Sequence, residues 1–347
     1  MPLHNLHQHF LDQPKFRVKQ AKTAVFKDLI DNWEQATNFP LALRQKLNRN
    51  CPLLNKAEYF VSQDQRAVKA LIELADGKKI ETVLLKNKDG RNSLCVSSQV
   101  GCPMGCQFCA TGQMGFKRDL ETDEIISQAL IMSRYLKNQD GLQAKITNII
   151  FMGMGEPFLN YDNVMRAIKI LNEAEGYNLG ARHFSISTCG VIPGIQQLAK
   201  EKLQINLAIS LNAPTDELRS KLMPINKKYK LGKLFNAIND YVKRTNRLVM
   251  FEYLLIKNIN DNPGLAKQLA KLLDSRLFLV NLIPYNPTGK FSPSDKKQIA
   301  AFKKVLETEG IKVTQRLSFG ADIMAACGQL AGTRIKYQNK IVAHYIP

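Results

Sequence analysis

The sequence predicts an α/β protein whose main part is an incomplete (β/α) barrel, and three observations lead to this prediction. From Val96 onward, short β-type runs alternate with helical stretches, which is typical of a parallel sheet covered by helices. The alternation gives too few units for an eight-fold barrel, so an open doubly wound sheet is the second choice. The length of 347 residues allows two domains, or one large α/β unit with appendages.

The N-terminal part, residues 1–75, is predicted to be a small helical domain. Apolar-periodic stretches at 21–33 and 41–47 are separated by Asn-Phe-Pro at 38–40, and Lys and Arg are frequent among them. We interpret this part as an RNA-binding accessory domain, with an ordinary solvated helical surface as the alternative.

A short β meander is predicted over residues 76–100. The pairs Asp76-Gly77 and Asp89-Gly90 are turn signals, and they separate short apolar segments. The segments expected to form strands are 71–74, 82–85 and 94–96.

The partial barrel is predicted over residues 101–335, with a tail at 336–347. Thr122 is predicted to cap the first helix, because acidic residues follow it and favour the positive end of a helix. Ligands of such a sheet gather at the carboxyl ends of its strands. The expected strands are 149–152, 184–187, 205–211, 249–256, 278–283 and 313–317, and the expected helices are near 123–137, 161–174, 194–203, 231–245, 263–274 and 295–308.

The charge balance points to a polyanionic partner. The chain has 49 Lys+Arg against 30 Asp+Glu, a formal net charge of +19, and its pI is near 9.6. Nucleic acid is the simplest partner of that kind, because Lys and Arg neutralise phosphates and release counterions. A hydrophobic content of 45% and a charged content of 23% exclude wholesale disorder.

No run of about 18 apolar residues is present, so a membrane span and a membrane partner are not expected. The N-terminus lacks the apolar core of a secretory signal, so a cytoplasmic location is expected. The seven cysteines should then stay reduced, and clustered thiols indicate metal or redox chemistry.

Cys102, Cys106 and Cys109 form a C-x3-C-x2-C spacing on one short glycine-containing loop. Three thiolates so close in sequence can hold a [4Fe–4S] cluster and leave one iron open for a small molecule. Structural zinc usually takes four ligands, and the loop contains no fourth Cys or His. A zinc knuckle is therefore the alternative.

The cysteine loop resembles that of the radical S-adenosylmethionine (SAM) superfamily. The longer string from Cys95 through Cys-Ala-Thr-Gly at 109–112 is typical of a smaller group of proteins within this superfamily. Three further motifs follow in order: Met-Gly-Met-Gly-Glu-Pro at 152–157, Lys-Leu-Met-Pro-Ile-Asn at 221–226 and Ala-Ala-Cys-Gly-Gln-Leu at 325–330. Together they resemble the RlmN type of RNA adenine-C2 methyltransferases, whose relatives of the Cfr type methylate adenine C8. The resemblance runs from about residue 80 to 332.

The resemblance implies a radical SAM fold, a [4Fe–4S] cluster held by the three loop cysteines, and SAM on the open iron. Cleavage of SAM gives a radical, which the reaction needs because the electron-poor C2 of adenine cannot attack a methyl group. The residues implied to contact SAM are Gly155, Glu156, Ser187, Ser210, Leu211, Asn212 and Asn286. Relatives often carry His in place of Asn212, and an asparagine side chain can also hydrogen-bond there.

Three further residues take catalytic roles by the same resemblance. Cys327 accepts a methyl group from one SAM, and the radical from a second SAM removes a hydrogen from it, so that the carbon then links protein and RNA. Cys95 resolves this adduct through a transient disulfide with Cys327. Glu81 is the base that removes the C2 proton. Cys51 and Cys189 receive no role.

The function expected from the resemblance is methylation of adenine C2 in 23S ribosomal RNA. Transfer RNA, at the adenine 3′ of the anticodon, is a further substrate left open, and the electron donor expected is a flavodoxin or ferredoxin. A Cfr-like adenine-C8 methyltransferase is the nearest alternative. An alternative of another class is a non-catalytic, zinc-stabilised RNA-binding protein.

Overall fold

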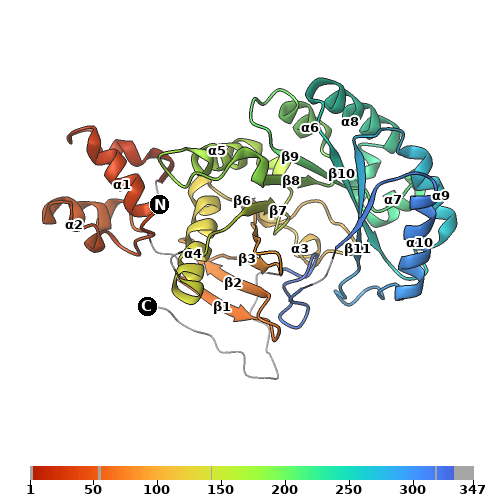
Figure 1. The fold of residues 1–347 in the computed structure, drawn as a ribbon, viewed down its shortest axis with the longest axis horizontal. Coiled ribbons are helices and arrows are strands. Elements are labelled where there is room, and N and C mark those ends of the chain that lie inside the picture. Colours follow the sequence, from red (N-terminus) through yellow and green to blue (C-terminus); the bar gives the residue numbers. More distant parts are fainter. Residues whose placement is uncertain (1–2, 54–55, 142, 317–318, 332–347) are drawn as a thin grey trace.

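The computed structural model describes residues 3–53, 56–141, 143–316 and 319–331 (Figure 1). The strands are β1 (Lys56–Val61), β2 (Ala67–Glu73), β3 (Lys79–Lys86), β4 (Asn92–Cys95), β5 (Gln99–Gly101), β6 (Phe116–Asp119), β7 (Asn148–Phe151), β8 (Phe184–Thr188), β9 (Asn206–Ser210), β10 (Val249–Leu255), β11 (Phe278–Pro284) and β12 (Val313–Gln315). The helices are α1 (Phe16–Phe26), α2 (Leu41–Asn50), α3 (Ala110–Gln113), α4 (Thr122–Asp140), α5 (Tyr161–Asn172), α6 (Ile192–Leu198), α7 (Asp216–Leu222), α8 (Leu231–Thr245), α9 (Pro263–Leu272) and α10 (Lys296–Thr308).

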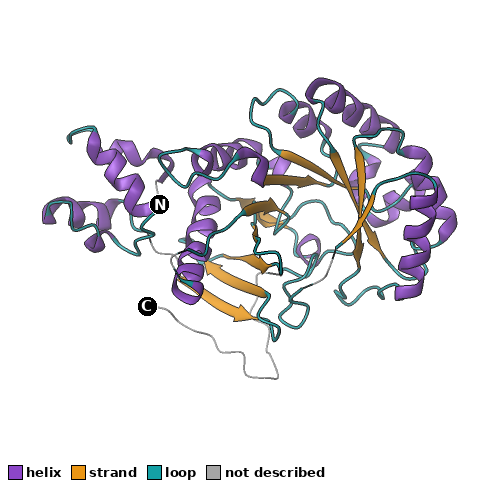
Figure 2. Cartoon of the chain, viewed as in Figure 1, coloured by secondary structure: helices purple, strands orange, loops and turns teal. Residues whose placement is uncertain are grey.

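Within these residues, one sheet holds ten strands in the order β1-β2-β3-β4-β7-β8-β9-β10-β11-β12. The pairs from β1 to β4 are antiparallel, whereas every pair from β4 to β12 is parallel. Strand β12 is the edge of the sheet and does not pair with β4, so the parallel part is an incomplete barrel, as predicted. Helices cover its outer face (Figure 2).

Strand β10 shows why these residues build a barrel wall. Alternate side chains of a strand point to opposite faces. Phe251 and Tyr253 point outward, where their rings lie 5.6 Å from Phe235 of α8 and 5.1 Å from Phe302 of α10. Glu252, between them, faces the barrel interior and lines its cavities. The helices therefore seal the outer face, and the inner face is left for a site.

The N-terminal helices form a module at one side of the barrel (Figure 1). Trp33 is fully buried in it and donates a hydrogen bond from Nε1 to the carbonyl of Cys51 at 2.7 Å. The module is fastened to α4, because Arg134 donates to the carbonyl of Ile30 at 2.7 Å and His4 bonds to the carboxylate of Asp123. Buried hydrogen bonds of this kind hold the two parts in one arrangement.

The predicted extent of the helical domain was wrong at its C-terminal end. Strands β1 and β2 both lie within residues 1–75, which the sequence analysis assigned to a helical domain, with a strand expected only at 71–74. The reason is a hairpin turn without the usual Asn-Gly or Asp-Gly signal: Gln65 adopts a φ of 57°, and Ser62 and Asp64 close the turn with a 2.6 Å hydrogen bond. The predicted tail, 336–347, lies outside the described residues.

The predicted cap of α4 was also wrong by one residue. Glu121, not Thr122, is the N-cap, and it forms a capping box with Glu124. Thr122 instead donates to Asn163 of α5 at 3.0 Å. The strands and helices expected from 123 to 315 are present with shifted ends, whereas α3, α7 and the β5–β6 pair were not expected. No helix of the described part has the length and apolar character needed to cross a membrane.

Candidate active site

The carboxyl ends of the parallel strands and the cysteine loop surround one cavity. Its wall comes from several elements that are far apart in the sequence. Residues lining it include Cys102, Cys106, Cys109, Met152, Gly155, Glu156, Ser187, Ser210, Asn212, Glu252, Arg316 and Cys327. The strand topology thus places the three loop cysteines, most residues expected to contact SAM, and Cys327 around the same space.

The cysteine loop is held by backbone contacts at both ends. Gly101 has a φ of 76°, and a Cβ there would lie 1.9 Å from the carbonyl oxygen of Gly115, so only glycine fits. The N–H of Cys102 donates to that same carbonyl at 3.1 Å. Further along, the N–H of Gln107 donates to the carbonyl of Leu222 at 2.9 Å. The loop therefore has a fixed path between β5 and α7.

Burial disfavours the thiolate form of all three loop cysteines. Burial raises the pKa of Cys102 to about 12 and that of Cys106 well above its usual value, and the neighbouring thiols raise both further. Burial also raises the pKa of Cys109. Thiolates form here once a positive charge compensates them, which an iron–sulfur cluster supplies. Among the described residues, no three His, Cys, Asp or Glu side chains are arranged to hold a metal ion.

Glu156 connects two strand ends at the cavity wall. Its carboxylate accepts from the N–H of Cys189, after β8, at 2.8 Å and from the N–H of Phe158 at 3.1 Å. Burial raises its pKa, while these hydrogen bonds lower it. Both carboxylate oxygens are thus held by backbone, and the carboxylate lines the cavity in a fixed orientation.

Gly155 lies where the backbone after β7 passes very close to β5. Its φ is 102°, and a Cβ would lie 2.6 Å from the Cβ and 2.8 Å from the backbone nitrogen of Gln99. We expect Gly155→Ala to lower the free energy of unfolding by about 2–4 kcal/mol, because strain and overpacking act together. Denaturant unfolding measures this. Gly232→Ala on α8, where a Cβ meets nothing within 4 Å, is the control and should be neutral or stabilising; equal losses in both variants would contradict the argument.

Ser187, Ser210 and Glu252 form a polar group on neighbouring strands. Ser187 Oγ donates to Glu252 Oε2 at 3.1 Å and lies 3.4 Å from Ser210 Oγ. The other oxygen, Glu252 Oε1, is buried with no hydrogen-bond partner in the described part and faces Arg316 Nη1 at 3.7 Å. Burial raises the pKa of Glu252, and Arg316 lowers it. The sequence analysis did not select Glu252 or Arg316.

Asn212 and Leu211 have different surroundings although they are adjacent. Asn212 has a φ of 59°, which asparagine tolerates, and its Oδ1 accepts from the N–H of Leu254 at 2.9 Å. Its side chain therefore ties β9 to β10 and lines the cavity. Leu211 is fully buried in the hydrophobic core, and it is not among the residues that line the cavity.

Arg219 of α7 supports the strand ends from behind the cavity wall. The side chain is fully buried, and burial lowers its pKa. It donates to the carbonyls of Cys189 at 2.6 Å and Leu211 at 3.2 Å, and to Asn226 Oδ1 at 3.0 Å. The Lys-Leu-Met-Pro-Ile-Asn motif noted in the sequence thus ends in the partner of this arginine, which was itself not selected.

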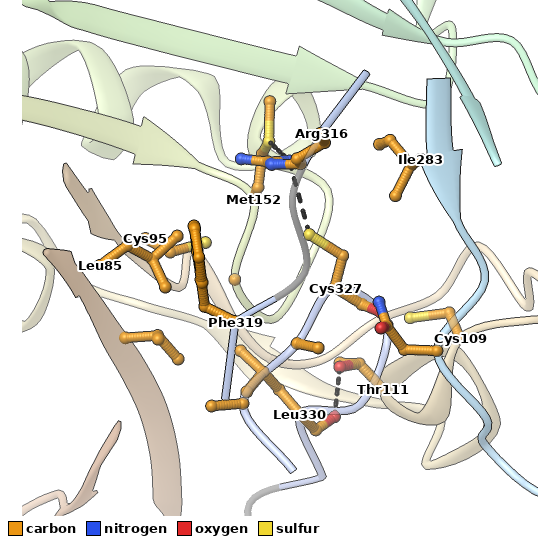
Figure 3. A pocket seen from close by; sticks show the side chains of 16 residues that line it. Leu85, Cys95, Cys109, Thr111, Met152, Ile283, Arg316, Phe319, Cys327 and Leu330 are labelled. Carbon is orange, nitrogen blue, oxygen red and sulfur yellow. Dashed lines mark hydrogen bonds between the residues drawn. The ribbon is translucent and has the colours of Figure 1, made fainter. Parts of the chain in front are cut away.

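Cys327 and Cys95 line a second cavity that shares Met152, Arg316 and Cys327 with the first (Figure 3). Figure 3 shows their sulfur atoms on opposite sides of this cavity, with Cys109 near Cys327. Arg316 Nη1 lies 3.4 Å from the sulfur of Cys327 and 3.4 Å from the sulfur of Met152. Cys327 raises the pKa of Arg316, while burial and the nearby Cys327 raise the pKa of Cys95 to about 12.

The segment that carries Cys327 is bonded to the cysteine loop. The N–H of Ala110, next to Cys109, donates to the carbonyl of Gly328 at 2.7 Å. Thr111 Oγ1 donates to the carbonyl of Leu330 at 2.6 Å. Asn286, another residue expected to contact SAM, donates to the carbonyl of Cys327 at 3.3 Å and lines the second cavity.

Glu81 does not line either of these two cavities. It is 1% exposed and its Oε1 lies 3.1 Å from Nζ of Lys69, which is equally buried. Its other oxygen accepts from the N–H of Ala331 at 3.0 Å. The carboxylate is thus placed against the Cys327 segment, on the side of β2 and β3.

Comparison with known proteins agrees with the radical SAM resemblance over most of the chain. Residues 96–268 match the Radical SAM superfamily. A "Probable dual-specificity RNA methyltransferase RlmN" of Dictyoglomus turgidum is 45% identical over 332 residues, covering 95% of this chain and 94% of that protein. One of the same description from Chloroflexus aurantiacus is 43% identical, covering 92% and 88%. The crystal structure of a radical SAM methyltransferase from Sphaerobacter thermophilus superposes with a TM-score of 0.91 at 41% identity, covering 95% and 97%.

Proposed function

Because this chain belongs to the RlmN family of radical SAM RNA methyltransferases, we propose that it methylates adenine C2 in 23S ribosomal RNA. The observation that carries the proposal is the arrangement of Cys327, Cys95 and the cysteine loop around two cavities with shared walls. A zinc-stabilised binding protein without catalysis, the alternative considered for the sequence, does not agree with membership of this enzyme family.

Cys102, Cys106 and Cys109 would hold a [4Fe–4S] cluster, and the cavity wall beyond them would hold SAM. When bound, these groups supply a methyl cation equivalent and, after reduction of the cluster, a carbon radical. Glu156, Ser187 and Ser210 present oxygen atoms to the cavity, which suits the ammonium and hydroxyl groups of SAM. Gly155 lets a ligand approach the backbone.

Cys327 is the methyl carrier in this proposal. Its sulfur attacks the methyl carbon of one SAM and displaces the neutral thioether, so the carbon becomes bound to the protein. This S-methyl group would give a hydrogen atom to the carbon radical that cleaved SAM supplies, its carbon would add to adenine C2, and the extra electron of the adduct would pass to the oxidised cluster. Arg316 Nη1 lies 3.4 Å from the sulfur and would orient it for the first step.

Cys95 would release the product by attacking the sulfur of Cys327. The carbon then leaves with the RNA and takes up a proton to become a methyl group, and the two cysteines form a disulfide that a reductant reopens. The position of both residues on one cavity supports this role. Because the pKa of Cys95 is raised to about 12, its thiolate forms only in contact with a suitable proton acceptor.

We expect Cys95→Ala to accumulate a covalent complex between protein and RNA, since the step that frees the base is lost. Denaturing gel electrophoresis with labelled RNA measures the complex, and turnover should fall to a single round at most. The double variant Cys95→Ala/Cys327→Ala is the control and should form no complex. Multiple turnover by Cys95→Ala would show that another group resolves the adduct.

Glu81 is proposed to take the proton from adenine C2. Glu81 lies on β3, two and four residues before Val83 and Leu85, which line the second cavity. In the present arrangement the carboxylate contacts Lys69 and Ala331, so proton transfer requires its rotation toward the base.

The proposed partners are ribosomal RNA, transfer RNA as a second substrate, and a flavodoxin or ferredoxin as electron donor. The net charge of +19 suits both polyanions, and the basic N-terminal helices are the proposed accessory surface for RNA. Presenting one adenine to an enclosed cavity requires its removal from the stack. The cytoplasm is the proposed location, since these RNAs are there.

The regiospecificity is tested by nuclease digestion of RNA modified with the reconstituted protein. Mass spectrometry against 2-methyladenosine and 8-methyladenosine standards separates the two products. We expect 2-methyladenosine, in ribosomal RNA and in transfer RNA assayed separately. Finding 8-methyladenosine alone would assign the chain to Cfr-like chemistry instead.

A further inference from the structure

The most deeply buried ion pair of the described part lies outside the two cavities, between strands β2 and β3. Lys69 and Glu81 are each 1% exposed, and Lys69 Nζ lies 3.1 Å from Glu81 Oε1. The ammonium also lies 5.5 Å from the centre of the Phe60 ring. A pair of charges in such a place gives little net stability, because removing both from water costs about as much as their attraction returns.

Both members of this pair also bind the segment that carries Cys327. Lys69 Nζ donates to the carbonyl of Met324 at 3.4 Å. Glu81 Oε2 accepts from the N–H of Ala331 at 3.0 Å. These two contacts lie on either side of Cys327 in the sequence, so the ion pair bridges the two ends of the turn that presents the sulfur.

The same segment makes other contacts with the N-terminal strands. Asp322 accepts from the N–H of Gln63 at 2.9 Å, and the Arg66 guanidinium lies 3.9 Å from the centre of the Phe319 ring. Gly320 has a φ of 70°, and a Cβ there would lie 2.7 Å from the Cβ of Ala67. Residues 319–331 therefore pack against the antiparallel strands, and Lys69 lies buried at the centre of this contact.

We propose that Lys69 is a positioning residue for methyl transfer, which it serves by holding the turn at Met324 and the carboxylate of Glu81 at Ala331. On the opposite side the turn is bonded to Ala110 and Thr111 of α3, directly after the cysteine loop. The sulfur of Cys327 is thus fixed between two supports, and Lys69 supplies the one on the side of β2. This inference rests on the proposed role of Cys327 as methyl carrier.

The test uses the double variant Lys69→Met/Glu81→Gln in the full chain. Removing both charges avoids an unpaired buried charge, and the amide oxygen introduced by Glu81→Gln can still accept from Ala331. After anaerobic reconstitution with SAM, peptide mass spectrometry measures the rate at which Cys327 gains a methyl group. We expect this rate, which belongs to a step before the proton transfer assigned to Glu81, to fall about ten-fold, the effect of losing a hydrogen bond from a charged group, while the melting temperature stays near wild type.

The matched control is the variant Glu73→Gln/Lys79→Met. It removes a second β2–β3 ion pair, with 3.8 Å between the charged atoms, which is partly exposed and has no hydrogen bond with residues 319–331 in the described part. Its methyl loading should equal that of wild type. Wild-type loading in the Lys69→Met/Glu81→Gln variant would overturn the proposal, because the pair would then serve only the fold.

Hydrogen exchange of the wild-type protein gives a second test that needs no variant. If Lys69 and Glu81 hold the turn, the amides of 320–331 should exchange as slowly as those of β2 and β3. Fast exchange of 320–331 beside protected strands would overturn the proposal even if the double variant does not fold. A wild-type protein whose Cys327 gains no methyl group would contradict the proposed function, whereas the exchange result would still decide whether the turn is held.

Discussion

Replacing Cys327 by alanine is expected to reduce RNA methylation by about a thousand-fold or more, while SAM cleavage continues. Among the described cysteines, Cys327 is the one whose sulfur lies 3.4 Å from the guanidinium of Arg316. It also lines a cavity together with Cys95. In the proposed mechanism, loss of this nucleophile removes the covalent step that carries the reacting carbon, and other groups do not replace it. Methylated RNA is measured by mass spectrometry, and SAM cleavage by chromatography of its adenosine product.

Cys51→Ala is the control for this thiol deletion. Cys51 is fully buried in the N-terminal module, and its backbone carbonyl, not its sulfur, accepts from Trp33. Methylation by Cys51→Ala should remain near wild type. If Cys327→Ala retained methylation, the carbon would have to reach adenine without a carrier on this residue.

Replacing Cys106 by alanine is expected to remove bound iron and with it both SAM cleavage and RNA methylation. Cys106 is buried, and the nearby thiols of Cys102 and Cys109 raise its pKa further. All three thiolates therefore need the same positive charge beside them. Two cysteines do not hold the cluster as three do. Iron and sulfide analysis after anaerobic purification should give about four of each per wild-type chain and background levels for the variant.

Cys189→Ala is the matched control for the iron site. Cys189 is buried, lines the same cavity, and lies close enough to Cys106 for that thiol to raise its pKa. Its backbone holds Glu156 and Arg219, and its thiol also hydrogen-bonds to Glu156, but it is not expected to be an iron ligand, so this variant should keep its iron. Iron loss in Cys189→Ala with retention in Cys106→Ala would show that the ligand set is different.

The sequence was sufficient to predict the parallel strands, although not their exact ends, and the resemblance supplied the residues expected to contact SAM. The parallel strands repeat a β-then-α pattern, and side chains just past such strands converge by geometry alone. Ser187, Ser210 and Asn212 accordingly lie on one cavity. Which of their atoms face the cavity could not be predicted, because it depends on contacts between distant segments, such as Asn212 with Leu254.

The charged residues inside the protein were missed for a different reason. Arg219 lies on a short helix, where an arginine is usually solvated, and its burial follows only from the packing of α7 against the strand ends. Lys69 alternates with apolar neighbours on β2, which normally places a lysine outside. Glu252 did give a signal, since an acidic residue within Val-Met-Phe-Glu-Tyr-Leu-Leu is unusual in a buried strand.

The hydrogen bonds of Ala110 with Gly328 and of Thr111 with Leu330 have a consequence for the lifetime of the enzyme. They join α3, which follows the proposed cluster ligands, to the segment that carries the proposed methyl carrier. Loss of the cluster is therefore expected to loosen the segment that holds the sulfur of Cys327 as well. If Cys327 is the methyl carrier, as proposed, a protein that has lost its cluster is expected to gain less methyl on this residue.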